Sequence, residues 1–187
     1  MTDSTSLANH FLIAMPQLAD PNFFHSVTYI CEHNNDGAMG IVINRPLEIG
    51  LAEVLDHINI SGNNKAIDDQ VIYMGGPVQP ERGFVLHSPS GQWDSTLAIA
   101  DDICITTSRD ILTAIANDQG PAHYVIALGY AGWGKGQLEE EISQNAWLSG
   151  PAEQNILFDM PYEKRWEAAA SLLGIDVNLI SGEAGHA

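Results

Sequence analysis

Apolar and polar residues alternate in short runs through the first third of the chain, a pattern typical of strands. They predict strands over His10–Met15 and Ser26–Cys31, and a further strand over Ala38–Asn44 that ends before Pro46. Between the last two strands lies Asn34–Gly37, whose residue types tolerate positive φ and favour a hairpin-like turn. The pattern therefore predicts an antiparallel start to the fold.

Further along the chain, short apolar runs typical of strands and apolar residues at helical spacing follow one another in no regular order. A near-continuous apolar run over His123–Leu128 is consistent with a central strand. Ser108 is a candidate N-cap for the helix that follows it. The remaining expected strands are 71–74, 83–87 and 103–106, and helices are expected over 51–58, from about 137, and over 162–173.

The predicted hairpins come first in the chain, and the predicted helices follow at irregular positions. This order favours an α+β fold over a fold built from strictly alternating βαβ units. Glycines cluster at the ends of the predicted strands, which suits a strongly curved or bifurcated, mostly antiparallel sheet with helices packed on it. The 187 residues show no repeat or linker. We therefore expect a single domain over 1–187, with 1–7 as a loose tail.

Charge narrows the possible partners. Seven Lys and Arg stand against 24 Asp and Glu, a net charge of -17. Direct nucleic-acid binding is not expected, because such binding needs a basic face that neutralises phosphates. No basic start, signal-like segment or long apolar run is present, so a cytoplasmic chain without a membrane span is expected. Cys31 and Cys104 are expected to be buried free thiols.

The segment Gly129–Gly136 has the spacing of a phosphate-binding loop, with Lys135 in the lysine position. However, Gly136 stands where such loops carry the Ser or Thr that holds Mg²⁺. Three glutamates at 139–141 would also repel a phosphate at the following helix. The alternative is a tight turn that lets Trp133 pack against the sheet.

Cys31 and His33 flank Glu32 near the end of a predicted strand, and strict alternation would put Cys31 and His33 on one face. Such a pair could form a thiolate nucleophile or supply metal ligands. Two ligands on one strand do not complete a metal site. A structural role at the mouth of the hairpin is the favoured interpretation, and no metal or cofactor is predicted.

Two arginines stand out in so acidic a chain, Arg45 beside Pro46 and Arg82 beside Gly83. A guanidinium can grip a carboxylate through two parallel hydrogen bonds, whether the carboxylate belongs to a ligand or to the protein itself. The candidate internal partners are Glu32, Glu48, Glu81 and Asp110.

Several stretches together resemble the AlgH/YqgE family of bacterial proteins: LIAMPQLADPNFFHSVTYICEH, GAMGIVINRP, YMGGPV, RGFVLH, GYAGWGKGQLEEEI and NAWL. The resemblance implies a single α+β domain whose bifurcated sheet folds into a pseudo-barrel. It implies no established catalytic activity or ligand, and one member's name links it to regulation of alginate production. The polar positions that it carries over as a candidate ligand-binding site are Glu32, His33, Asn44, Arg45, Arg82, Trp133 and Gln137.

Three functional hypotheses follow. The first is a non-enzymatic regulatory or interaction protein with a protein partner. The second is a binder of, or an enzyme acting on, a small anionic metabolite, and it requires Arg45, Arg82 and the Gly129–Gly136 segment to converge. The third is a thiol-dependent enzyme that uses Cys31.

Overall fold

The computed structural model describes residues 6–16, 18, 20–21, 23–64, 67, 69–91, 93–100 and 102–176. Its strands are β1 (His10–Ala14), β2 (Val27–Asn34), β3 (Gly37–Val42), β4 (Pro46–Gly50), β5 (Val71–Met74), β6 (Val78–Ser88), β7 (Thr96–Ala98), β8 (Cys104–Thr106), β9 (His123–Trp133) and β10 (Trp147–Pro151). Its helices are α1 (Leu51–His57), α2 (Arg109–Ala116), α3 (Gln137–Ser143) and α4 (Tyr162–Ser171), with a π-helical turn over Asn155–Asp159.

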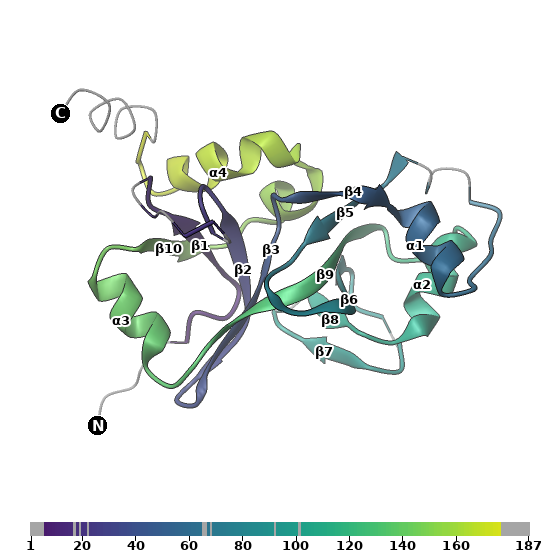
Figure 1. Ribbon diagram of the computed structural model, residues 1–187, viewed down its shortest axis with the longest axis horizontal. Helices are drawn as coiled ribbons and strands as arrows, with labels where there is room; N and C mark the ends of the chain where they lie inside the picture. The colour runs from purple at the N-terminus through teal and green to yellow at the C-terminus, as the bar shows by residue number, and fades with distance from the viewer. Residues whose placement is uncertain are drawn as a thin grey trace.

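One long strand, β9, joins two halves of a curled sheet with the order β10-β1-β2-β3-β9-β6-β8-β7. Along one edge, β9 pairs antiparallel with β6. Along the other, its first half pairs parallel with β5 and its second half pairs antiparallel with β3. Figure 1 shows β9 crossing diagonally between the two halves. The α+β class and the bifurcated, mostly antiparallel sheet expected from the sequence are confirmed.

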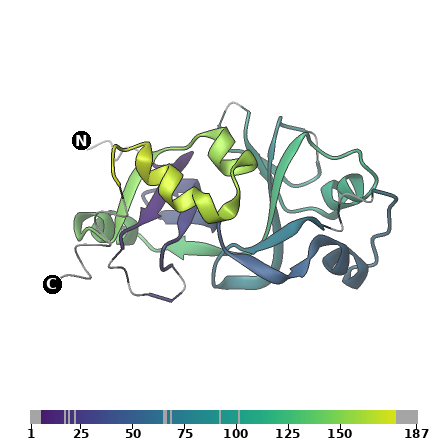
Figure 2. The same ribbon diagram turned by 90° about the horizontal axis from the view of Figure 1, so that it is seen from above.

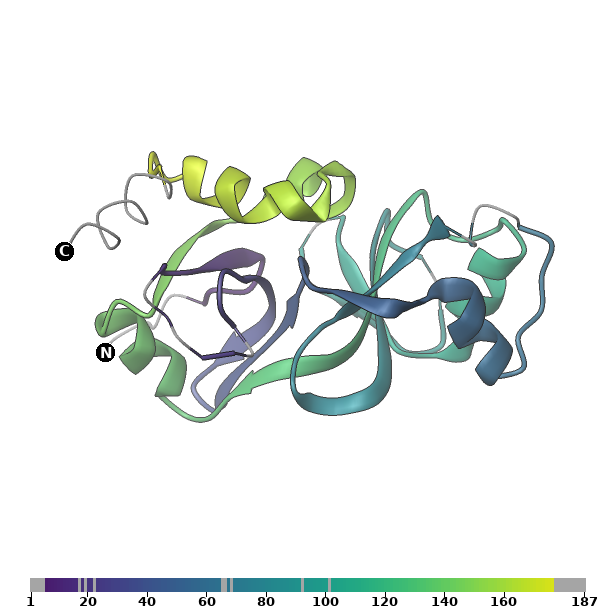
Figure 3. The same cartoon turned by 45° about the horizontal axis from the view of Figure 1, so that its top comes forward.

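The helices cover different parts of this sheet. In Figures 2 and 3, α4 lies across the strands of the first half. Its Ala169 and Ala170 join a core cluster with Phe11 and Tyr29. A second cluster is formed by α1 and α2 against β5, β6 and β9, and a third by α3 with Trp133 and the neighbouring strands. None of the described helices is long and apolar enough to cross a membrane.

Glycines allow β9 to cross the segment before β6 at close range. Gly76 has φ of 156°, and a Cβ there would lie 2.1 Å from the carbonyl carbon of Tyr130. Gly129 has φ of 78°, and a Cβ there would lie 2.4 Å from the carbonyl oxygen of Gly76. The predicted end of the strand at Leu128 is therefore wrong. The first half of the expected glycine-rich loop is strand, because its glycines serve this crossing.

A β-bulge between Ile30 and Glu32 changes the phase of β2. Cys31 packs in the core beneath α4, whereas His33 lies on the side of α3, where its ring faces Glu139. The prediction that Cys31 and His33 share a face is wrong, since a bulge inserts one residue and breaks strict alternation.

Other local expectations met mixed outcomes. The hairpin turn is confirmed, because Asn34 pairs with Gly37 across two loop residues. Ser108 precedes α2 as expected, but its hydroxyl contacts Asp110 Oδ1 rather than capping the helix. In the expected loose tail, Ser6 and Leu7 hydrogen-bond to His33, and residues 1–5 lie outside the described part of the chain.

Candidate functional site

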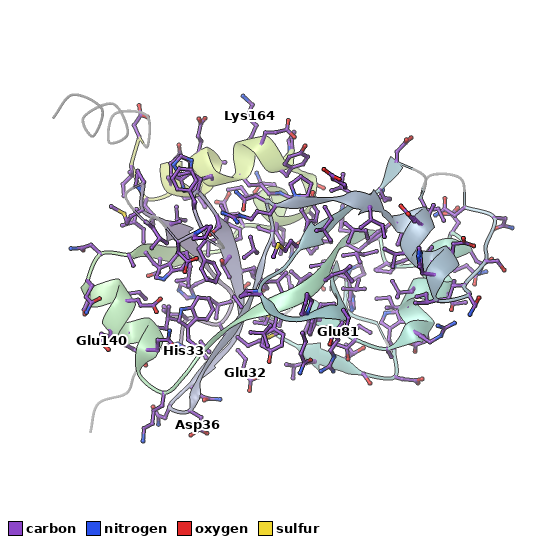
Figure 4. The ribbon with its side chains drawn as sticks, viewed as in Figure 1. Glu32, His33, Asp36, Glu81, Glu140 and Lys164 are labelled. Atoms are coloured by element: carbon purple, nitrogen blue, oxygen red, sulfur yellow. The ribbon has the colours of Figure 1, made fainter. Side chains whose placement is uncertain are left out.

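A depression of about 610 Å³ lies between the β2–β3 hairpin, β6 and β9. Three of the predicted site residues, Glu32, Arg82 and Trp133, line it. Figure 4 shows Glu32 and Asp36 of the β2–β3 hairpin, both near the lower edge of the molecule. Lys164 of α4 lies at the upper edge. The depression is thus on the side of the sheet remote from that part of α4.

Aromatic rings form part of this depression. Phe84 and Tyr130 meet edge to face, with ring centroids 5.7 Å apart. The guanidinium of Arg82 lies 5.4 Å from the centre of the Phe84 ring. Its Nη1 also donates to Gln79 Oε1 at 3.4 Å, and no described carboxylate lies within 4.0 Å of it. Arg82 is therefore exposed and free of the internal ion pair considered from the sequence.

A second, more apolar depression of about 360 Å³ continues the first, because Met39 and Phe84 line both. It extends to β7, where Leu97 is 50% exposed. We call the two together the hairpin groove. Its lining comprises Glu32, Asn34, Asp36, Gly37, Ala38, Met39, Val78, Arg82, Phe84, Asp94, Ser95, Thr96, Leu97, Ile105, Thr107, Tyr130, Gly132 and Trp133.

Asn44 and Arg45 lie elsewhere, in a depression of about 570 Å³ beside α4. Arg45 donates to the carbonyl oxygens of Pro21 and Phe24, the latter at 2.6 Å. Asn44 accepts from Val27 N at 2.9 Å and donates to the carbonyl oxygen of His25 at 3.0 Å. Both side chains therefore hold the connection between β1 and β2. Arg45 and Arg82 do not share a depression, so the convergence that the metabolite hypothesis requires is not formed.

Gln137 and Trp133 belong to a network around Glu141 of α3. Gln137 Oε1 accepts from Gly134 N at 2.9 Å, and Gln137 Nε2 donates to Glu141 Oε2 at 2.9 Å. The indole N–H groups of Trp133 and Trp147 both donate to Glu141 Oε1, at 3.0 and 2.9 Å. The Gly134 N–H that a phosphate would need is therefore already bound. These contacts support the tight-turn alternative for this segment.

His33 is held at the N-terminal segment. Its Nδ1 accepts from Leu7 N at 2.9 Å, which assigns the proton of the neutral ring to Nε2. Nε2 lies 3.4 Å from Glu139 Oε2, without the geometry of a hydrogen bond. His33 lines neither the hairpin groove nor the depression beside Arg45.

Cys31 is 4% exposed, and burial raises the pKa of its thiol well above the ordinary range. A buried, protonated thiol is a poor nucleophile, so the geometry does not support the thiol-enzyme hypothesis. Cys104 is likewise free and buried. Among the described residues, no group of three His, Cys, Asp or Glu side chains is arranged to hold a metal ion.

The sequence did not single out Asp36, Met39, Phe84 or Tyr130 as groove residues. For Phe84 a signal was available, because it stands two residues after Arg82 and alternation puts both on one face of β6. Tyr130 was hidden because its segment was interpreted as loop. Met39 was interpreted only as part of an apolar strand.

Comparison with known proteins identifies the family. A model of the AlgH-like family (DUF179) matches residues 11–178. The chain belongs to the AlgH-like family. The resemblance noted in the sequence is thereby confirmed. A UPF0301 protein of Thioalkalivibrio sulfidiphilus is 59% identical over 187 residues, covering 100% of both chains. Another from Nitrosococcus oceani is 58% identical and covers 96% of each.

Two solved structures agree with the AlgH-like fold described above. The solution structure of the AlgH protein from Pseudomonas aeruginosa has a TM-score of 0.81 and 50% identity, covering 100% of this chain and 99% of that one. The crystal structure of protein DIP2367 from Corynebacterium diphtheriae has a TM-score of 0.73 at 18% identity, covering 97% and 94%. At that identity, the second likeness shows the fold alone.

Proposed function

We propose that this AlgH-like protein is a non-enzymatic regulatory protein of the cytoplasm that binds an extended segment of a protein partner in the hairpin groove. The observation that carries the proposal is the groove itself, an aromatic and apolar recess with Arg82 exposed at its side. Aromatic residues, Met and Arg are the types enriched at protein interfaces, and few such residues supply most of the binding energy.

The charges around the groove favour a basic partner over an anionic metabolite. Glu32, Asp36 and Asp94 line it, with one arginine to offset them. The whole chain carries a net charge of -17, which attracts basic segments and repels anions at long range. The same charge argues that any regulation proceeds through a protein rather than through direct DNA contact.

The cytoplasmic location remains part of the proposal. Cys31 and Cys104 are both free and buried, as is usual for proteins of a reducing compartment. A regulatory role suits this geometry because the groove is open, and Glu32 and Arg82 at its side form no ion pair with a described residue.

The test compares co-purification with a tagged wild-type chain and with a groove variant, Glu32→Ala/Met39→Ala/Arg82→Ala. A matched control carries Glu163→Ala, Lys164→Ala and Leu172→Ala on and beside α4, away from the groove. We expect one partner to be recovered with the wild type and the control and reduced at least about tenfold with the groove variant, as losses at interface hot spots predict.

Equal recovery by the wild type and the groove variant would place the interaction elsewhere and overturn the proposal. A purified chain that converts a substrate, with turnover lost in the groove variant, would overturn the non-enzymatic part.

A further inference from the structure

Arg165 of α4 is a buried arginine without a carboxylate partner among the described residues. Its exposed fraction is 3%. Nε donates to the carbonyl oxygen of Met160 at 3.0 Å, and Nη1 donates to the carbonyl oxygen of Ile43. Its guanidinium carbon lies 5.2 Å from the centre of the Tyr73 ring. None of its nitrogens lies within 4.0 Å of a described Asp or Glu oxygen.

A buried charge is costly unless an opposite charge or several hydrogen bonds compensate for it. Two carbonyls and the phenol of Tyr73 provide part of the compensation for Arg165. Burial still lowers the pKa of the guanidinium, and Tyr73 only partly opposes that shift. The site therefore retains positive charge that is not matched by a nearby negative one.

Arg165 lines a cavity of about 170 Å³ between β5, β9 and the π-helical turn. The volume resembles that of an engineered protein cavity that admits benzene, so a molecule of a few heavy atoms fits. The exposed lining is mostly polar, with Tyr73 and Tyr124 among its residues, and Val71 and Phe158 add a smaller apolar part. The cavity thus combines a cationic end with a small apolar patch.

We propose that this cavity binds a short-chain monocarboxylate, whose carboxylate pairs with Arg165 while its short alkyl chain lies against the small apolar patch. A guanidinium binds a carboxylate more strongly than it binds a neutral amide, because the hydrogen bonds are assisted by charge. Asp69 lies at the cavity and is exposed, which disfavours multiply charged anions such as phosphate. A single negative charge on a small ligand matches the single guanidinium.

The net charge of -17 opposes any anion at long range, but salt screens that field over about 8 Å at physiological ionic strength. Local pairing with Arg165 then decides binding. This site is separate from the hairpin groove, since their lining residues do not overlap. Failure of one proposal leaves the other intact.

The experiment titrates the whole chain with sodium propionate in 150 mM NaCl, following the thermal midpoint and the Nε–Hε signal of Arg165 by nuclear magnetic resonance. Propionamide is the neutral isostere, and sodium chloride and sodium phosphate at equal ionic strength are the ionic controls. At about a hundred times its dissociation constant, propionate is expected to raise the midpoint by about 5 to 10 °C. It is also expected to shift the Arg165 signal.

Two variants locate the effect. Arg165→Gln removes the charge. Val71→Trp places a bulky side chain at the cavity from an exposed position and keeps the arginine itself, so the test stays decisive if Arg165→Gln does not fold. Lys164→Ala, the neighbouring residue on the same helix, should keep the full response.

Loss of the propionate response in Val71→Trp together with its retention in Lys164→Ala supports the site. The proposal is overturned if propionate causes no shift. It is equally overturned if propionamide or phosphate matches propionate, or if Val71→Trp responds like the wild type.

Discussion

Removing the carboxylate of Glu141 should destabilise the fold more than its half-buried position suggests. One oxygen of this side chain accepts both indole N–H groups, from Trp133 and Trp147, and the other accepts from Gln137. The two tryptophans are 6% and 3% exposed. Glu141→Ala would leave both indoles without their acceptor in a packed cluster.

An unpaired buried donor costs about 1–3 kcal/mol. Because Glu141 is only half-buried, water can reach part of the site, and the lower end of that range applies to each indole. We therefore expect Glu141→Ala to lower the free energy of unfolding by about 2–3 kcal/mol. Glu141→Gln keeps one oxygen for the indoles but faces an amide with the Gln137 amide. Its expected loss is about 0.5–1.5 kcal/mol.

Guanidinium denaturation followed by circular dichroism measures these differences without relying on the fluorescence of the same tryptophans. Glu140→Ala is the matched control, since Glu140 lies on the same helix and is exposed, and its expected effect is within about 0.5 kcal/mol. If the free energies of unfolding of Glu141→Ala and Glu140→Ala agree within about 0.5 kcal/mol, the two indole hydrogen bonds do not contribute the expected stability.

Three further outcomes follow. Gly76→Ala should lower the free energy of unfolding by more than about 3 kcal/mol, because its Cβ would meet the Tyr130 backbone at 2.1 Å. Gly136→Ala, with φ of 74° and open space around it, should lower it by only about 1–2 kcal/mol. Equal losses in the two variants would contradict the close crossing. Burial lowers the pKa of His87 below its ordinary 6.5, so the unfolded chain takes up more protons there and stability falls as pH drops below about 6.5. Between pH 7.5 and 5, the thermal midpoint should therefore fall less steeply in His87→Gln than in the wild type. An unchanged slope would refute this assignment. Because the Cys31 thiol is buried and its pKa is raised, it should react with an aromatic disulfide reagent at least about a hundredfold more slowly in the native chain than in denaturant. Rapid labelling of Cys31 in the native chain, mapped by mass spectrometry, would contradict this.

The sequence predicts those parts of the fold that depend on neighbouring residues. The hairpin at Asn34–Gly37 was predictable because turn chemistry and the alternation around it agree. The helix after Ser108 was predictable from its apolar stripe, with Ile111 and Ile115 now seen to be buried. The curvature of the sheet was predictable from where the glycines cluster.

Features that depend on distant segments were not predictable. β10 carries Gly150 and Pro151, residue types that are depleted in strands, but it becomes a strand by pairing with β1. The extension of β9 through Gly129 depends on a crossing with Gly76, which no local pattern reveals.

The candidate site was only partly predictable for the same reason. Arg82 and Glu32 meet in one groove, but Arg45 is held by backbone carbonyls of the β1–β2 connection. A polar residue committed to such an internal contact cannot be distinguished in one sequence from a residue free to bind a ligand. The bulge at Cys31 adds to the problem, because one inserted residue reverses the face of everything beyond it.

The position of β9 has a consequence for how the chain is made. Strands β3, β5 and β6 all pair with β9, which is synthesised after them as residues 123–133. Strand β1 pairs with β10, which is synthesised later still. During translation each of these strands keeps one edge open until the residues of its later partner have been made, a situation that invites pairing with other chains. Acquisition of the native state is therefore expected to be late and post-translational rather than stepwise, and production in the cell should depend strongly on chaperones that shield nascent strands.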